Sequence, residues 1–199
     1  MTGRVKKLVR KVIRDRNRVA ADRSVVSTKI SLDMDTIPSD LREKILSSKV
    51  VAAYMPLPDE PDISEVLSAF EKNGATVCFP KVFGEDMAFF AARASECRNI
   101  GSFGIFEPDA DSKKILPEEM DLVLVPAMAF SEEGVRLGRG KGYYDKFFSG
   151  SNGFHGILIG VVAKKNLFPH LPSDVWDLTV NAILTEEGMI LPKERSGKN

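Results

Sequence analysis

The residue types most suited to chemistry lie in a glycine-rich segment, residues 134–145. Three glycines occupy alternate positions there, and cations stand between and before them (Gly138, Gly140 and Gly142; Arg136, Arg139 and Lys141). A backbone without Cβ atoms can turn its N–H groups inward around an anion. Cations crowded into one tight turn repel one another unless an anion lies among them. The segment therefore predicts a phosphate-binding loop, with a purely structural turn as the alternative.

The spacing of this loop differs from both common phosphate-binding motifs. A Walker A loop requires Ser or Thr after its lysine, but Gly142 follows Lys141. The dinucleotide fingerprint GxGxxG also fails, because the glycines here follow the pattern GxGxG. A helix predicted over residues 143–148 would add the positive end of its dipole to the same point. The loop is thus interpreted as a phosphate site of another kind.

A second group of cations lies at the N-terminus. Residues 1–23 carry nine basic and two acidic side chains, a net charge of +7, and the remainder carries −7. Apolar residues recur there with helical spacing (Val5, Leu8, Val9, Val12 and Ile13), which predicts an amphipathic helix with a cationic outer face. Lys6 and Arg10 share one face of that helix and could contact one anion together. A solvated basic surface is the alternative.

The elements that must position these residues alternate between helix and strand. Helices are expected over 25–32, 39–46, from 62 or 64 to 73, and 143–148, and strands over 49–55, 75–79 (ended by Pro80), 87–91, 121–126 and 156–162, with a closing hairpin over 182–191. Residues 93–117 are expected to be rich in loops. This alternation predicts an α/β fold: a single three-layer domain over 1–192, with a mostly parallel, Rossmann-like sheet flanked by helices and a disordered tail over 193–199. Ligands of such sheets bind at the carboxyl ends of strands, here after Met55 and Val125.

Composition excludes several other classes. The 199 residues are 43% hydrophobic and 28% charged, as in one soluble globular domain. The longest apolar run, 122–130, is too short for a membrane span, and the N-terminus lacks the apolar stretch of a signal peptide. Cys78 and Cys97 form no CxxC pair, so we expect reduced thiols in a cytoplasmic protein rather than a zinc site. His155 and His170 are interpreted as loop or packing residues.

The segment from Leu124 to Phe147 resembles the signature of the 5-formyltetrahydrofolate cyclo-ligase family. Similarity extends over nearly the whole chain: the basic Lys6 and Arg10, the loop after the first strand, the glycines at 101 and 104 before Glu107, and residues 172–177. The resemblance implies an enzyme that uses ATP and Mg²⁺ to close 5-formyltetrahydrofolate to 5,10-methenyltetrahydrofolate. Phosphorylation of the formyl oxygen would make it a leaving group, and N10 would then attack. Such a reaction requires positioning and cations more than covalent help from the protein.

The resemblance also implies residue roles. ATP would contact Lys6 and Arg10, together with Arg136, Leu137, Gly138, Arg139, Gly140, Lys141, Gly142, Tyr143 and Tyr144. Folate would contact Met55 and Glu60, together with Arg139, Gly140, Lys141, Gly142 and Tyr143. Arg139, Lys141 and Tyr143 would take part in catalysis, and Asp145 and Asp177 would bind magnesium. Taken alone, Glu60 could instead be an exposed loop acid, Asp145 a helix cap, and either tyrosine a packing residue.

Four positions depart from the family pattern: Ile63, Asn166, Trp176 and Asn181, where Thr, Gln, His and Asp are usual. Ile63, Asn166 and Asn181 leave open a non-catalytic relative that binds nucleotide or folate. A nucleic-acid-binding role for the basic helix is a third hypothesis, which overall neutrality and the lack of a reader motif disfavour. We therefore expect a small-molecule substrate, no nucleic-acid or membrane partner, and a monomer or homodimer.

Overall fold

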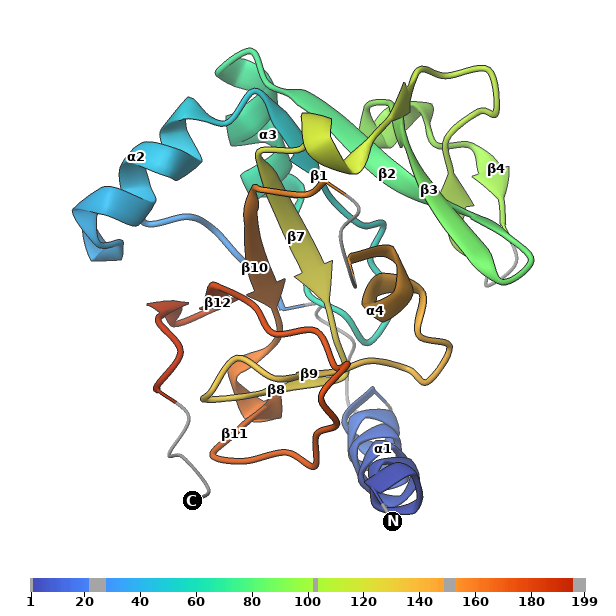
Figure 1. The fold of residues 1–199 in the computed structure, drawn as a ribbon, viewed down its shortest axis with the longest axis vertical. Coiled ribbons are helices and arrows are strands. Elements are labelled where there is room, and N and C mark those ends of the chain that lie inside the picture. Colours follow the sequence, from blue (N-terminus) through green and yellow to red (C-terminus); the bar gives the residue numbers. More distant parts are fainter. Residues whose placement is uncertain (1, 22–27, 102–103, 149–152, 195–199) are drawn as a thin grey trace.

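The centre of the fold is an eight-stranded sheet, seen in a computed structural model that describes residues 2–21, 28–101, 104–148 and 153–194 (Figure 1). The strand order is β13-β12-β10-β7-β1-β2-β3-β6. Neighbours from β12 to β2 are parallel, and β13, β3 and β6 join antiparallel at the two edges. The predicted mostly parallel α/β sheet is confirmed. Its strands are β1 (Val50–Ala52), β2 (Thr76–Phe83), β3 (Asp86–Ala91), β6 (Lys114–Ile115), β7 (Leu122–Pro126), β10 (Ile157–Val161), β12 (Ala182–Thr185) and β13 (Gly188–Ile190).

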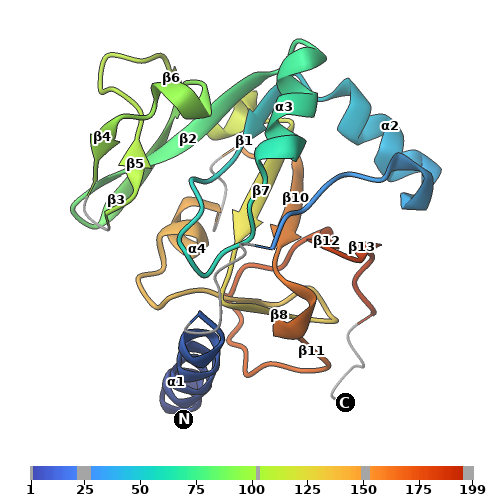
Figure 2. The ribbon, with the colours of Figure 1, turned by 180° about the vertical axis from the view of Figure 1, so that it is seen from behind.

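Successive side chains of β7 point to opposite faces of the sheet, and both faces are covered. Leu122 and Leu124 pack into one core cluster with residues of α2 (Ser39–Ser47) and α3 (Ser64–Lys72). Val123 and Val125 point the other way, into a cluster that includes Tyr144 of α4 (Tyr143–Phe148). A strand buried on both faces needs a continuous apolar run, and β7 is buried at every position. Figure 2 shows α3 on the face opposite α4, so the helices form the two outer layers.

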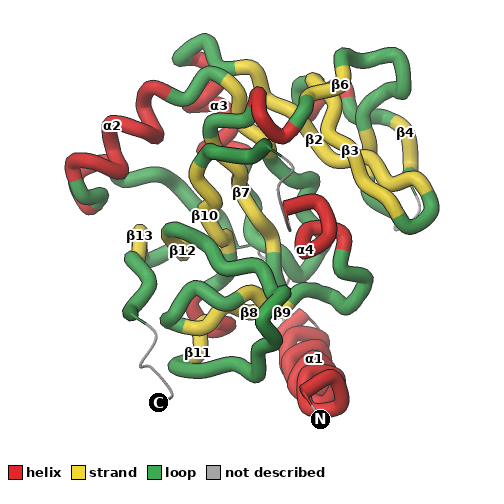
Figure 3. The backbone as a smooth tube through the Cα atoms, in the orientation of Figure 1, coloured by secondary structure: helices red, strands yellow, loops and turns green. Residues whose placement is uncertain are grey.

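Short elements surround this core. A small sheet with the order β11-β8-β9 combines β8 (Ala129–Ser131), β9 (Arg136–Leu137) and β11 (Leu167–Phe168). The pair β4 (Asn99–Ile100) and β5 (Phe106–Glu107) lies in the loop-rich region. Short 3₁₀ turns cover Met34–Thr36, Ala94–Glu96, Pro117–Glu119 and Lys164–Asn166. Strands of two or three residues carry too little periodicity to be predicted, but the β8–β9 hairpin matters because it leads directly into the glycine-rich loop (Figure 3).

The N-terminal helix α1 (Thr2–Ala21) is present but is turned differently from the prediction. Val5, Leu8 and Val12 are exposed, whereas Lys6 is only 6% exposed. Ile13 is the apolar anchor, packed with residues of the β8–β9 hairpin. The predicted cationic outer face is therefore wrong for Lys6, because its ammonium group lies against the carboxylates of Asp174 and Asp177 in the main body.

Two further predictions were wrong. The helix expected over 25–32 is absent from residues 28–32, and residues 25–27 lie outside the described part of the chain. Instead Lys29 forms a parallel bridge to Asp62, and the Ile30 N–H donates to the Asp62 carbonyl at 3.0 Å, so this segment pairs as extended chain. Pro80 does not end β2, which continues to Phe83 against β3. The neighbour on the other side, β1, has already ended opposite Cys78, so the missing proline N–H breaks no pairing there.

The remaining expected elements correspond to α2, α3, α4, β1, β3, β7, β10 and the β12–β13 hairpin, with boundaries shifted by a few residues. Of the expected tail, Lys193 and Glu194 are described, and the Lys193 N–H donates to the Glu132 carbonyl at 2.9 Å. Residues 195–199 lie outside the described part. Among the described helices, none combines the length and apolar character needed to cross a bilayer.

Candidate active site

The glycine-rich loop, residues 138–142, joins β9 to α4 and lies between two cavities. One cavity, of about 390 Å³, has mostly apolar walls and is called here the apolar cavity; its walls include Met55, Glu60, Met87, Arg139, Lys141 and Tyr143. The other, of about 360 Å³, is called the cationic cavity and is lined by Lys6, Arg10, Gly140, Asp145, Lys146 and Asp177, among others. Gly142 lines both. One loop thus faces two separate binding spaces.

Glycine is required in this loop for two different reasons. Gly140 and Gly142 have φ of +105° and +73°, a region that other L-residues adopt only with strain. Gly138 has an ordinary φ, but a Cβ there would lie 2.5 Å from the Arg136 guanidinium. The alternation of glycines noted in the sequence therefore reflects both the turn of the backbone and its close approach to a buried cation.

Arg136, in β9, holds the start of the loop in place through several contacts. Its Nε donates to the Pro126 carbonyl at 2.9 Å, and one terminal nitrogen lies 3.6 Å from the Asp145 carboxylate. Its guanidinium also lies 4.8 Å from the centre of the Tyr144 ring. Burial lowers the pKa of Arg136, and Asp145 opposes that shift. Arg136 thus links the end of β7 to α4 and fixes the direction in which the loop leaves β9.

Arg139 crosses the apolar cavity to the loop after β1. Its Nε donates to the Glu60 carboxylate at 3.1 Å, and a terminal nitrogen lies 2.5 Å from the Asp59 carboxylate. The second Glu60 oxygen accepts from the Leu57 N–H at 3.1 Å. Glu60 is only 7% exposed, so the alternative of an exposed loop acid is excluded. Burial raises the pKa of Glu60; for Arg139 the two carboxylates outweigh burial and raise the pKa.

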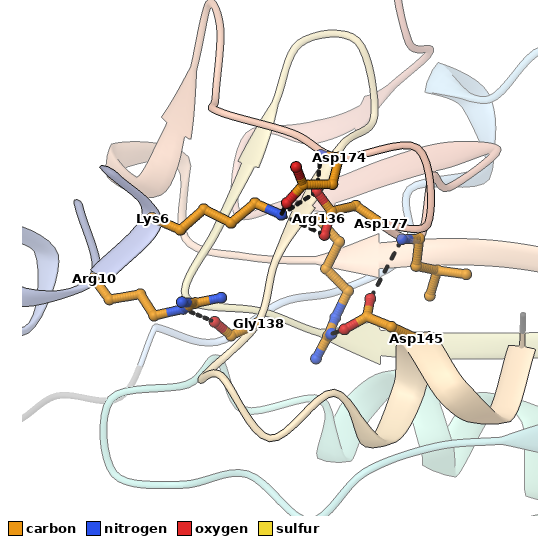
Figure 4. A network of polar contacts seen from close by, with 8 residues as sticks. Lys6, Arg10, Arg136, Gly138, Asp145, Asp174 and Asp177 are labelled. Atoms are coloured by element: carbon orange, nitrogen blue, oxygen red, sulfur yellow. Dashed lines mark hydrogen bonds and ion pairs between the residues drawn. The ribbon is translucent and has the colours of Figure 1, made fainter. Parts of the chain in front are cut away.

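Lys6 and Arg10 attach α1 to the other side of the loop (Figure 4). The Lys6 ammonium donates to Asp177 at 2.7 and 2.5 Å and to Asp174 at 2.7 Å. The Arg10 Nε donates to the Gly138 carbonyl at 2.7 Å. These contacts bring together residues that are 128 to 171 positions apart in the chain. The pairing of Lys6 and Arg10 on one helix face is confirmed, and both side chains line the cationic cavity.

The two aspartates expected to bind magnesium both line the cationic cavity, but their surroundings differ. Both Asp177 oxygens already accept from Lys6, and one also accepts from the Asp174 N–H at 2.6 Å. Asp145 accepts from the Leu178 N–H at 3.3 Å and lies beside Arg136. Among the described residues no cluster of three or more Asp, Glu, His or Cys side chains could hold a metal. Magnesium needs only one or two carboxylates when phosphate oxygens and waters complete its shell, so Asp145 fits this role and Asp177 fits only if Lys6 moves away.

The two adjacent tyrosines have different environments. The Tyr143 hydroxyl donates to the Gly84 carbonyl at 2.8 Å, across to the β2–β3 turn, and the residue lines the apolar cavity. Tyr144 is buried, and its ring meets Phe89 edge-on at 6.3 Å between centroids. Tyr144 therefore serves mainly to pack α4 against the sheet, although part of it also faces the apolar cavity.

Most residues that the sequence singled out reach one cavity or the other, with two exceptions. The Leu137 side chain is buried in the small cluster around Ile13, and Gly138 uses its carbonyl to bind Arg10. Several residues of both cavities were not predicted from the sequence. In the apolar cavity these are Tyr54, Leu57, Pro80, Val82, Met87, Ile105, Pro126 and Ala127. In the cationic cavity they are Gly3 and Lys146, together with Asp174, which accepts a hydrogen bond from Lys6. Reading β2 through Pro80 would have pointed to Pro80 and Val82.

Three of the four departures from the family pattern have structural roles. Ile63 is fully buried in the main core. The Asn166 side chain accepts from Arg16 of α1, and the Asn181 side chain accepts from the Leu158 N–H at 2.8 Å. The fourth departure, Trp176, lines the cationic cavity. Both histidines lie at the surface, and His170 contacts Glu133 at 3.0 Å.

Comparisons with known proteins identify the family and the fold. The family described as the 5-formyltetrahydrofolate cyclo-ligase family matches residues 3–186. A probable 5-formyltetrahydrofolate cyclo-ligase from Schizosaccharomyces pombe is 32% identical over 158 residues, which cover 71% of this chain and 77% of that protein. The solution structure of 5,10-methenyltetrahydrofolate synthetase from Aquifex aeolicus has a TM-score of 0.68 and 29% identity, over 98% of this chain and 96% of that one. A Mycoplasma pneumoniae synthetase shares the fold, with a TM-score of 0.61 and 19% identity over 91% and 98% of the two chains.

Proposed function

The chain belongs to the 5-formyltetrahydrofolate cyclo-ligase family, and we propose that it converts 5-formyltetrahydrofolate to 5,10-methenyltetrahydrofolate with the consumption of ATP. The observation that carries this proposal is the loop shared by the two cavities. A reaction that joins a phosphoryl donor to a folate requires both molecules to meet at one point. Gly142, which lines both cavities, marks that point.

The apolar cavity suits the folate. Its walls are mostly aliphatic and aromatic, and the buried Glu60 stands in it as a carboxylate acceptor. A pterin ring offers apolar faces and a row of N–H donors on one edge, which a carboxylate can accept two at a time. In the proposed complex the Met55 and Tyr143 side chains contact the folate, and Glu60 sets the orientation of its pterin. Arg139 then connects Glu60 to the loop that carries it.

The cationic cavity suits the triphosphate. Lys6 and Arg10 approach it from α1, Lys146 from α4, and the backbone of Gly140 from the loop. Bound magnesium would neutralise charge on the phosphate oxygens, and Asp145 is the residue that would hold it. Lys6 is pre-positioned by its two aspartates, and it could exchange Asp177 for a phosphate oxygen when nucleotide enters.

The proposed chemistry uses the loop as a clamp on the transferred phosphoryl group. The formyl oxygen attacks the γ-phosphorus, the bond to ADP breaks, and the formyl carbon becomes an iminium-like electrophile. N10 then attacks that carbon and loses its proton, and the carbon–oxygen bond breaks to release phosphate. Arg139 and Lys141 would stabilise the charge that develops on the phosphoryl oxygens, which is the largest protein contribution in such transfers.

Product analysis tests the proposal. Purified protein incubated with MgATP and 5-formyltetrahydrofolate is expected to form the methenyl product and ADP in equal amounts. Omitting either substrate should abolish both products. A folded sample that binds both substrates but forms neither product would contradict the proposal and support binding without turnover. Of the departures that first suggested that alternative, Ile63 packs in the core, Asn166 accepts from the Arg16 side chain and Asn181 accepts from the Leu158 N–H. None of the three lines either cavity.

A further inference from the structure

Trp176 is the only tryptophan of the chain, and it is 67% exposed at the wall of the cationic cavity. Tryptophan is usually mostly buried, because an exposed indole ring leaves a large apolar surface in contact with water. Its neighbour Val175 is 95% exposed and does not contribute to that cavity's wall. The Trp176 ring is therefore not needed for packing of the core, and its exposed face is available to a ligand.

The backbone that carries Trp176 is held in place. The Asp177 N–H donates to the Asp174 carbonyl at 3.1 Å, and the Asp174 N–H donates to the Asp177 carboxylate at 2.6 Å. These two bonds close a four-residue turn with Val175 and Trp176 at its tip. Lys6 of α1 bonds both aspartates and ties the base of the turn to the cationic cavity (Figure 4). The indole is therefore presented from a fixed turn rather than from a loose loop.

We propose that the Trp176 ring is the stacking platform for the base of the nucleotide whose phosphates occupy the cationic cavity. A nucleotide joins a planar π-system to a polyphosphate, and this cavity combines one exposed aromatic ring with the cations Lys6, Arg10 and Lys146. Stacking on an aromatic ring is tolerant of the base, because every base has a π-face. The platform thus supplies affinity for the nucleoside part, separately from the cations that hold its phosphates. This inference rests on the proposed use of ATP.

Intrinsic fluorescence tests the platform directly, since all tryptophan emission comes from this one residue. Adding MgATP to the whole protein is expected to change the Trp176 emission strongly and with saturation. Magnesium tripolyphosphate, which has the phosphates but no base, is expected to compete for the site with little change in emission. Equal responses to the two ligands would overturn the platform. Failure of MgATP to bind at all, measured by calorimetry, would overturn the proposed function and the platform with it.

Substitution provides the second measurement. Trp176→Ala is expected to raise KM for ATP on the order of 10-fold with kcat and KM for the folate unchanged, as loss of one base stack typically does. Trp176→Phe keeps an aromatic face and should restore most of that loss. Val175→Ala, at the other tip position of the same turn, is the matched control and should behave as wild type. A KM for ATP that is equal in Trp176→Ala and Val175→Ala, with ATP turnover intact, would overturn the inference and leave the proposed function standing.

Discussion

The ammonium group of Lys6 bonds both carboxylate oxygens of Asp177, 171 residues away in the chain. Burial alone would lower the pKa of Lys6, but the hydrogen bonds to Asp174 and Asp177 outweigh it and raise the pKa. The pair holds the first helix of the protein over the loop that separates the two cavities. It also decides which face of α1 turns inward.

Lys6→Met should loosen α1 and leave two carboxylates facing each other without a cation. We expect a fall of about 1 kcal/mol in the free energy of unfolding, since the carboxylates of Asp174 and Asp177 keep contact with solvent, and a marked rise in KM for ATP. A raised pKa means that the stabilisation by Lys6 is complete below the ordinary lysine pKa and is lost as pH rises through the folded-state value. Denaturant unfolding at pH 7 and pH 11 checks this. Lys7→Met, on the adjacent exposed position of the same helix, should change neither quantity.

Lys141→Ala should lower kcat on the order of 10- to 1000-fold while the fold stays intact, because it removes a cation from the phosphoryl clamp. Arg139→Ala should lower kcat by a similar factor and also lower stability, since it removes the ion pair that Arg139 makes with the buried Glu60. Lys44→Ala, at an exposed position of α2, is the control for loss of one positive charge. Steady-state kinetics and thermal unfolding separate the two effects. Unchanged kinetics in both loop variants would show that the loop is structural.

Glu60→Gln should raise KM for the folate on the order of 10- to 100-fold, because an amide cannot accept two hydrogen bonds from the pterin edge as a carboxylate does. It should also change how stability depends on pH. Burial raises the pKa of Glu60, so the folded protein holds a proton that the unfolded chain has already lost, and wild-type stability falls as pH rises through that window. Gln removes this loss. The stability of Glu60→Gln relative to wild type should therefore increase with pH above the ordinary glutamate pKa, as measured by denaturant unfolding from pH 4 to pH 8.

The thiols of Cys78 and Cys97 should react slowly with thiol reagents in the native protein. Burial raises the pKa of Cys78 to about 12 and that of Cys97 to about 11, and only the thiolate attacks such reagents. In denaturant both thiols should react at once. Two rapidly labelled thiols in the native state at pH 7.5 would contradict the buried positions. A Cys78→Ser variant assigns the slower of the two native phases.

The sequence was sufficient to predict most strands of the sheet, but not the edge strand β6 or the way α1 docks on the sheet. Strands such as β7 can be predicted because a continuous apolar run, typical of a strand buried on both faces, is a local property of five residues. The inward face of α1 depends instead on Asp174, Asp177 and the Gly138 carbonyl, which lie more than 120 positions away. The helical periodicity of a sequence shows which residues share a face. It does not show which face packs against the rest of the protein when the partners are charged.

The candidate site shows the same division. The glycine-rich loop could be predicted as a phosphate-binding segment, since glycine spacing and interleaved cations are local features. The apolar walls opposite it could not, because Pro80 and Val82 reach the cavity only through a strand that continues past a proline. Asp174 lies in a segment that carries the family resemblance, but no local pattern assigned it a role, since its role is to share Lys6 with Asp177.

The attachment of α1 has a consequence for how the protein responds to ionic strength. Ile13 is its one fully buried apolar anchor among the described side chains, while Lys6, Arg10 and Arg16 make its polar contacts to the body. The sheet is held by apolar burial that added electrolyte leaves intact, whereas the attraction of the α1 cations for Asp174, whose side chain is 21% exposed, weakens as the Debye length shrinks. Concentrated potassium chloride should therefore release the helix before it unfolds the domain, and the enzyme would lose its hold on the nucleotide while its core remains native.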